Sequence, residues 1–165
     1  MTMTTRPAST QDAGAIAGIY NEGIEDRVAT FETRPRTSDD IRRWFDGIHP
    51  VVIVEDNGEP IAFAAASQYR PRECYAGIAE VSVYVARGSR RRGAGRLALS
   101  ALIEAARTAG YWKLLSRVFP ENNASLSMIA TLGFRQVGVY EKHGQLDGMW
   151  KDVVIVERLI PENLR

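Results

Sequence analysis

The sequence predicts a mixed α/β fold built on one central sheet, and three observations carry this prediction. The length of 165 residues suits one domain with one core. Segments with the two-residue alternation of strands recur between segments with helical spacing, in the order β-α-α-β-β-β-α-β-α-β-β. Because no repeat, low-complexity tract or linker divides the chain, residues 1–165 are expected to fold as a single domain.

The N-terminal half of the chain predicts one strand, two helices and a hairpin. Helices are marked by cap residues followed by apolar residues at helical spacing, and strands by β-branched alternation bounded by turn residues. The expected elements are a strand at residues 3–7, a helix capped by Ser9 or Thr10 and running from Ala13 past Tyr20, a short helix containing Ile41, Trp44 and Phe45 after the capping box Thr37-Ser38-Asp39-Asp40, and strands at 50–55 and 61–68 around the turn Asp56-Asn57-Gly58. A basic loop over residues 69–75 follows the hairpin.

The C-terminal half predicts four strands and two helices. An alternating strand at residues 79–86 precedes an amphipathic helix that begins at about Gly93 and that Gly110 ends. The remaining elements are a strand at 113–118, a helix at 122–132 ended by Gly133, and two closing strands at 134–142 and 151–159.

Charge and cysteine content argue against several classes of protein. Lys and Arg total 21 against 20 Asp and Glu, so the net charge of +1 gives no general attraction to nucleic acid. Cys74 is the only cysteine, and His49 and His143 are the only histidines, so neither an internal disulfide nor a metal site is expected. No apolar run approaches 18 residues and no signal-peptide core is present, which predicts a cytoplasmic protein without a membrane partner.

The stretch Arg90-Arg91-Arg92-Gly93-Ala94-Gly95 lies between the alternating strand and the amphipathic helix. The first N–H groups of a helix have no intrahelical acceptors, and the helix dipole adds positive charge at the same end. Glycine lets an anion approach the backbone, and arginine adds forked donors. A solvated basic turn is the alternative, but the position between strand and helix favours a pyrophosphate site.

The chain resembles the GNAT acetyltransferase superfamily over nearly its whole length. Arg90-x-x-Gly93-x-Gly95 is similar to the signature for the pyrophosphate of acetyl-CoA, and Asn122-x-x-Ser125 with Leu132-Gly133-Phe134 is similar to the second conserved region. The resemblance implies a mostly antiparallel sheet with splayed middle strands and about four flanking helices, with acetyl-CoA as co-substrate and no metal. The cofactor-binding residues that it implies are Val83, Tyr84, Val85, Arg90, Arg91, Arg92, Gly93, Ala94, Gly95, Arg96, Asn122 and Ser125. For Asn122, a helix N-cap role is an alternative of comparable weight.

Several segments resemble the phosphinothricin and arsinothricin N-acetyltransferases more closely. They are Ile19-Tyr20-Asn21, Thr30-Phe31-Glu32-Thr33-Arg34-Pro35, Glu80-x-x-Val83-Tyr84-Val85 and Trp150-x-Asp152-Val153, and the stretch from Tyr140 to Gly144 favours the arsinothricin branch. The resemblance implies acetyl transfer to the α-amine of a small acidic amino acid analogue, with detoxification as the outcome and a homodimer as the assembly. The alternatives are acetylation of methionine sulfone or sulfoximine, acetylation of a protein or peptide amine, and a non-catalytic coenzyme A sensor.

Two catalytic roles follow from the chemistry of acetyl transfer. Because an α-ammonium is mostly protonated at neutral pH, the reaction needs a base. The resemblance implies that Glu80, at the start of the strand beside the thioester and at the position of the family's catalytic glutamate, is this base, and a solvent-facing strand carboxylate is the alternative. The resemblance also implies that a backbone N–H of Val83 or Tyr84 acts as the oxyanion donor. Many relatives carry a proton-donating tyrosine or histidine where this chain has Ile129, but a thiolate is a tolerable leaving group without one. His143 is not expected to act in catalysis.

Two groups of residues are expected to bind the acceptor. Arg70, Arg72 and Tyr75 lie in the basic loop before Glu80, and the resemblance implies that this loop binds the anionic end of the substrate. A loop made basic for solubility is the alternative. Tyr20, Asn21 and Phe31 fall in the segment that roofs acceptor sites in the superfamily, and core packing explains Tyr20 and Phe31 about equally well.

Overall fold

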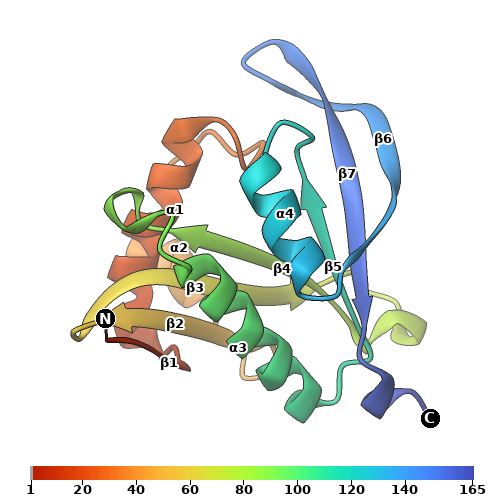
Figure 1. Ribbon diagram of the computed structural model, residues 1–165, viewed down its shortest axis with the longest axis horizontal. Helices are drawn as coiled ribbons and strands as arrows, with labels where there is room; N and C mark the ends of the chain where they lie inside the picture. The colour runs from red at the N-terminus through yellow and green to blue at the C-terminus, as the bar shows by residue number, and fades with distance from the viewer. Residues whose placement is uncertain (1) are drawn as a thin grey trace.

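The computed structural model describes residues 2–165 and contains a seven-stranded sheet with helices on both faces (Figure 1). The strands are β1 (Met3–Pro7), β2 (Val51–Asp56), β3 (Glu59–Gln68), β4 (Ile78–Val85), β5 (Lys113–Val118), β6 (Arg135–Leu146) and β7 (Met149–Leu159). The helices are α1 (Ala13–Asp26), α2 (Ser38–Arg42), α3 (Ala94–Ala109) and α4 (Asn123–Thr131). This is the mixed α/β architecture that the sequence predicts.

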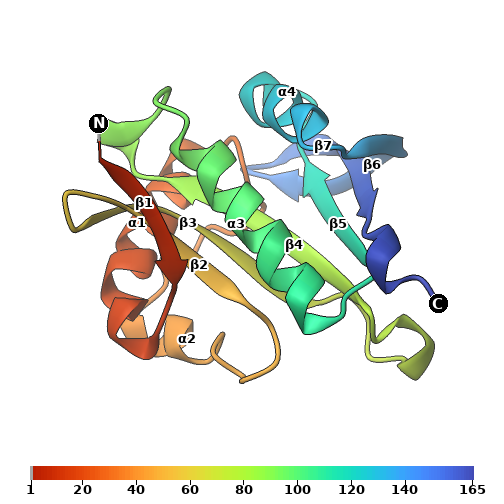
Figure 2. The ribbon, with the colours of Figure 1, turned by 60° about the horizontal axis from the view of Figure 1, so that its bottom comes forward.

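The sheet has the order β1-β2-β3-β4-β5-β7-β6, and every neighbouring pair is antiparallel except β4 and β5. The parallel pairing of β4 with β5 covers only Ile78 to Glu80 opposite Lys113 to Leu115. Beyond Glu80 the two strands diverge, as Figures 1 and 2 show. The predicted splay of the middle strands is therefore confirmed, and it opens a gap in the centre of the sheet.

Two apolar clusters hold the helices to opposite faces of the sheet (Figure 2). On one face Leu99, Leu102 and Ile103 of α3 pack over β2, β3 and β4. On the other face Ile16 of α1 and Ile41 of α2 pack against strand residues that include Ile53 and Phe63. Since apolar burial is the main driving force of folding, this two-sided burial fixes β3 and β4 as the centre of the molecule.

The predicted helix caps are present in the structure. Thr37 accepts a hydrogen bond from the N–H of Asp40 at 3.2 Å, and the Asp40 carboxylate accepts one from the N–H of Thr37 at 2.9 Å, which completes a capping box. Gly110 follows α3 with a φ of 94°, in the left-handed region that glycine adopts most readily. Local residue chemistry thus sets where these helices begin and end. None of the helices in residues 2–165 has the length and hydropathy that crossing a membrane requires.

Two predicted elements differ in extent. The short helix ends at Arg42, so Trp44 and Phe45 lie in the turn that follows it instead of inside the helix. The closing hairpin is longer than expected, because β6 continues to Leu146 and a two-residue turn, Asp147-Gly148, leads straight into β7. The prediction ended this strand at residue 142.

A bulge explains how β6 continues past residue 142. The register of β6 against β7 shifts between Tyr140 and Gly144, and Lys142 has a φ of 46°. The N–H of Lys142 donates to the carboxylate of Asp152 on β7 at 2.8 Å. A side-chain acceptor on the neighbouring strand therefore replaces the ladder hydrogen bond that the bulge removes.

Candidate functional site

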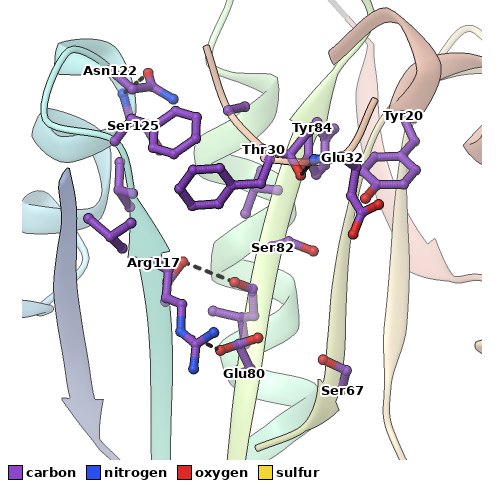
Figure 3. Close-up of a pocket in the computed structure, with 18 of the residues that line it drawn as sticks. Tyr20, Thr30, Glu32, Ser67, Glu80, Ser82, Tyr84, Arg117, Asn122 and Ser125 are labelled. Carbon is purple, nitrogen blue, oxygen red and sulfur yellow. Dashed lines mark hydrogen bonds and ion pairs between the residues drawn. The ribbon is translucent and has the colours of Figure 1, made fainter. Parts of the chain in front are cut away.

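A cavity of about 510 Å³ lies where β4 and β5 part (Figure 3). Residues from widely separated parts of the chain line it, and they include Tyr20 of α1, the segment 29–32, residues of β4 and β5, the start of α4, and the bulge of β6. Because the sheet is open at this point, the cavity is bordered by backbone as well as by side chains.

The backbone of β4 turns alternate residues toward the gap. The N–H of Ala86 bonds to Ile61 of β3, whereas the carbonyl of Val81 accepts a hydrogen bond from Ser116 of β5 at 3.0 Å. Since backbone groups alternate sides along a strand, Val81, Val83 and Val85 direct their N–H and C=O groups toward the gap. Of the two predicted backbone donors, Val83 faces the gap and Tyr84 is directed to β3.

Side chains of β4 divide between the two faces of the sheet in the same alternating way. Val83 and Val85 pack with the α3 cluster, while Tyr84 packs with the α1 and α2 cluster. Glu80 and Ser82 share the face of Tyr84, and all three line the cavity. The gap therefore connects a side covered by α3 and α4 to a side covered by α1 and α2.

Glu80 forms an ion pair across the gap with Arg117 of β5. The Nε atom of Arg117 lies 3.2 Å from Oε1 of Glu80, and 31% of the Glu80 side chain is exposed. Both side chains point into the cavity (Figure 3). The carboxylate predicted as a base is thus accessible from the cavity and is held in place by Arg117. The sequence analysis missed Arg117, and β5 gives only a weak signal for it, because this strand also contains Lys113 and Ser116.

Aromatic rings form the wall of the cavity on the α1 side. Tyr20 contacts Tyr84 edge to face with ring centroids 4.9 Å apart, and Trp44 lies 5.6 Å from Tyr20. A Cβ added at Gly23 would lie 2.6 Å from the ring of Tyr84, so this glycine lets α1 approach β4. Desolvation by burial raises the pKa of Tyr20 and of Tyr84, so both phenols stay neutral at neutral pH.

Phe31 and the bulge of β6 close the opposite wall. The ring of Phe31 contacts Phe119 edge to face at 4.9 Å, and a Cβ on Gly144 would lie 2.9 Å from it. His143 precedes this glycine, lines the cavity, and has its ring centroid 4.6 Å from that of Tyr140. The structure therefore places His143 at the site, where the sequence analysis assigned it no role.

The predicted pyrophosphate turn has the expected backbone geometry. Gly93 is the N-cap of α3 with a φ of 86°, and it leaves the first N–H groups of the helix without a side-chain acceptor. Arg90 pairs with Asp26 at 2.7 Å and Arg92 with Asp56 at 2.6 Å, while Arg91 has no side-chain partner within residues 2–165. Free N–H donors beside anchored guanidinium groups suit a pyrophosphate.

The two glycines of this turn have different roles. Nothing lies within 4 Å of a Cβ at Gly93, so its positive φ is what requires glycine there. A Cβ at Gly95 would lie 3.3 Å from Val85, so this glycine allows α3 to pack closely on β4. At Gly95 close packing inside the protein is thus a reason for glycine in addition to the predicted approach of a ligand.

Asn122 and Ser125 lie at the start of α4 and line the cavity. The Asn122 side chain accepts a hydrogen bond from the N–H of Ser125 at 3.2 Å, which confirms the N-cap role. Ile129 is 4% exposed and belongs to the α3 cluster. The side chain at this position therefore faces the core, away from the cavity.

Four predicted substrate residues lie outside the lining of the cavity. Asn21 forms two hydrogen bonds with the backbone of Arg36, donating to its carbonyl at 2.9 Å and accepting from its N–H at 2.8 Å. It therefore fixes the segment between α1 and α2, residues 27–37, here called the roof segment. Arg70 lies over the ring of Tyr69 and Arg72 over the ring of Tyr75, in the exposed loop between β3 and β4. Tyr20 and Phe31 line the cavity as predicted.

Comparison with known proteins agrees with this geometry. Residues 17–134 match the model of the Acetyltransferase (GNAT) family. The chain is 31% identical over 160 residues to the phosphinothricin N-acetyltransferase of Streptomyces coelicolor, covering 93% of this chain and 94% of that one. It is also 31% identical over 162 residues to the L-methionine sulfoximine/L-methionine sulfone acetyltransferase of Pseudomonas aeruginosa, covering 95% of this chain and 94% of that one.

Among solved structures, a GNAT superfamily phosphinothricin acetyltransferase from Sinorhizobium meliloti in complex with AcCoA matches with a TM-score of 0.89 and 28% identity. The alignment covers 97% of this chain and 89% of that one. Since the family match includes the split sheet, the glycine turn and the start of α4, the chain belongs to the GNAT family and is an acetyl-CoA-dependent N-acetyltransferase.

Proposed function

We propose that the protein acetylates the α-amine of a small acidic amino acid analogue of the phosphinothricin or arsinothricin type. The observation that carries the proposal is the Glu80 carboxylate, which lies at the gap in the sheet inside a cavity of about 510 Å³. A cavity of this size suits a small molecule. The substrates named for the relatives from Streptomyces coelicolor and Pseudomonas aeruginosa support an amino acid analogue, and methionine sulfoximine or sulfone is the alternative.

The α3 side of the gap, here called the donor side, would hold acetyl-CoA. The first N–H groups of α3 with Arg90, Arg91 and Arg92 would bind the pyrophosphate, as the resemblance to the superfamily signature implies. The gap-facing backbone of Val83 and Val85 would border the chain that carries the acetyl group, with Asn122 and Ser125 at the far wall. Acetyl-CoA supplies the thioester that the acceptor attacks.

The α1 side of the gap, here called the acceptor side, would hold the amine. Glu80 would accept the proton of the α-ammonium, directly or through one water, so that a neutral amine is available for attack. The N–H of Val83 would donate to the carbonyl oxygen and stabilise the charge that develops on it. Both groups belong to β4, so a single strand places the base relative to the oxyanion donor.

No dedicated acid is proposed for the departing sulfur. Ile129 is buried in the core, and the raised pKa of Tyr84 makes that phenol a weak acid. Tyr140 is half exposed, and its ring stacks near His143. A thiol with an ordinary pKa near 8.5 leaves as a thiolate at neutral pH, so acetyl transfer does not require a proton donor.

The direct test is release of free thiol when the protein receives acetyl-CoA with one candidate acceptor at a time. The panel consists of phosphinothricin, arsinothricin, methionine sulfoximine and methionine sulfone, with a lysine peptide and buffer alone as controls. We expect turnover with at least one of the four amino acids and background with the peptide. Turnover confined to the peptide, or coenzyme binding without any turnover, would contradict the proposal.

A homodimer assembled through β6 and β7 is part of the proposal. The long strand β6 is an edge strand, with β7 as its one neighbour in the sheet of residues 2–165. Large apolar side chains are exposed on the hairpin at Val137, Val139, Tyr140, Met149 and Trp150. A second copy would cover them, and light scattering would give twice the monomer mass for the native chain and a smaller mass for Trp150→Glu.

A reducing compartment, where the exposed free thiol of Cys74 persists, is the expected location.

A further inference from the structure

Arg117 is the one arginine or lysine among the residues that line the cavity. It extends from β5 across the gap, and its Nε atom lies 3.2 Å from Oε1 of Glu80. The two terminal nitrogens of its guanidinium make no hydrogen bond within residues 2–165, and 43% of the side chain is exposed. A guanidinium in this state presents two parallel N–H donors to a ligand.

The other charged side chains that line the cavity do not pair with the terminal nitrogens of Arg117. Glu32 lines the cavity, but its carboxylate pairs with Arg36 at 2.6 Å. Glu80 is held by the Nε of Arg117. The other polar side chains that line the cavity are hydroxyl and amide groups and the imidazole of His143, none of which is an anion. The terminal nitrogens of Arg117 are therefore a positive group that is free for an anion.

An α-amino acid carries its amine and its carboxylate on the same carbon atom. The cavity presents a carboxylate and a guanidinium side by side, from the neighbouring strands β4 and β5. We propose that Arg117 binds the α-carboxylate of the acceptor through its terminal nitrogens, while its Nε holds Glu80 beside the α-amine. This inference rests on the proposed function and specifies how an amino acid is distinguished from a simple amine.

The assignment differs from the one that the basic loop suggested. Arg70 and Arg72 lie over tyrosine rings of their own loop and do not line the cavity. Arg117 lies next to the base, which is where an α-carboxylate must be if the α-amine is to reach Glu80. Recognition of the α-carboxylate and activation of the amine are thereby joined in one ion pair.

The experiment compares two acceptors that differ only in the α-carboxylate: phosphinothricin and its decarboxylated amine, which keeps the same phosphinate. Both are measured with the native protein, Arg117→Met and Arg117→Lys. Charge-assisted hydrogen bonds of this kind correspond to roughly 10- to 100-fold in kcat/KM. We expect a loss of that size with phosphinothricin, mainly in KM, and a much smaller loss with the amine. Arg117→Lys should recover part of it.

Two controls keep the result interpretable. Arg135→Met removes an exposed arginine that pairs with Glu157 at 2.6 Å outside the cavity. This variant should leave kcat/KM unchanged with both acceptors. Arg70→Met tests the basic loop directly. Thermal unfolding and acetyl-CoA binding of each variant show that the fold and the donor side are intact.

Each other outcome has a distinct meaning. Equal losses with both acceptors in Arg117→Met would show that Arg117 only orients Glu80, and would overturn the inference while the proposed function stands. No loss, or a selective loss in Arg70→Met instead, would overturn it as well. Failure of the native protein with every amino acid would overturn the proposed function, and the inference with it.

Discussion

The donor side and the acceptor side of the gap are built in different ways. The donor side is built mainly from one continuous stretch, in which β4, the glycine turn and α3 follow each other over residues 78–109, and only its far wall comes from the start of α4. The acceptor side brings together Tyr20, Phe31, Arg117 and His143, which are far apart in the chain. A contiguous stretch has a local signature, whereas an assembled wall depends on the whole fold. The first is therefore recognisable from sequence, and the second is where specificity can change.

The two sides meet at the end of α1. Asp26 pairs with Arg90 at 2.7 Å and with Arg87 at 2.9 Å, which ties α1 to the pyrophosphate turn. Arg27 pairs with Asp147 at 3.0 Å, in the turn between β6 and β7. The roof segment that follows is thus anchored between the donor turn and the closing hairpin.

The largest expected effect comes from Glu80→Gln, which removes the proposed general base. General base catalysis contributes about 100- to 10,000-fold, so kcat/KM at neutral pH should fall within that range. The loss should shrink at high pH, where the free amine is abundant. The pH profile of thiol release checks this, with the exposed Glu59→Gln as control. A loss that is the same at all pH values would remove Glu80 as base.

Gly93→Ala should affect the donor side alone. At a φ of 86° an alanine is strained by about 1–2 kcal/mol, which corresponds to roughly a tenfold rise in KM for acetyl-CoA if the turn distorts. The KM for the acceptor should not change. Gly88→Ala, in the short 3-10 turn just before Gly93, is the matched control, since nothing lies within 4 Å of its added Cβ and its φ is not positive. An equal effect of both variants would contradict this assignment of strain.

Asn21→Ala should affect the acceptor side alone. It removes both hydrogen bonds to the backbone of Arg36 and frees the roof segment, so the acceptor KM should rise several-fold with little change for acetyl-CoA. Steady-state kinetics with each substrate varied separately measures this. Gln136→Ala is the control, because that exposed amide makes no side-chain hydrogen bond within residues 2–165. A change confined to the KM for acetyl-CoA would contradict the assignment of Asn21 to the acceptor side.

The smallest expected effect is a pH dependence of the cap of α2. The backbone N–H of Thr37 donates to Asp40 and lowers the pKa of this carboxyl from 3.8 to about 2. A lowered pKa means that the charged form stabilises the fold above about pH 4, and that this contribution is lost as the pH falls toward 2. Thermal unfolding of Asp40→Asn should therefore differ from the native protein at pH 7 and converge with it near pH 2. A constant difference would exclude this contribution.

Much of the fold could be predicted from residues that are close together in the sequence. The capping box at Thr37, the glycine after α3 and the order of elements are confirmed, because caps and turns depend on hydrogen bonds within a few residues. The predicted end of β6 was wrong, because the strand continues through a bulge that depends on Asp152 of the neighbouring strand β7. The helix containing Trp44 and Phe45 was too long for a similar reason, since both rings pack against the α1 and α2 cluster from a turn.

The sequence by itself determined the strand, the glycine turn and the helix of the donor side. These consecutive residues form the turn that we propose as the pyrophosphate site, and their spacing carries the information. Only the tertiary structure placed Arg117 beside Glu80, brought His143 to the cavity, and left Arg70 and Arg72 outside its lining. These placements follow from the divergence of β4 and β5 and from the bulge in β6, because a cavity between distant segments has no local pattern.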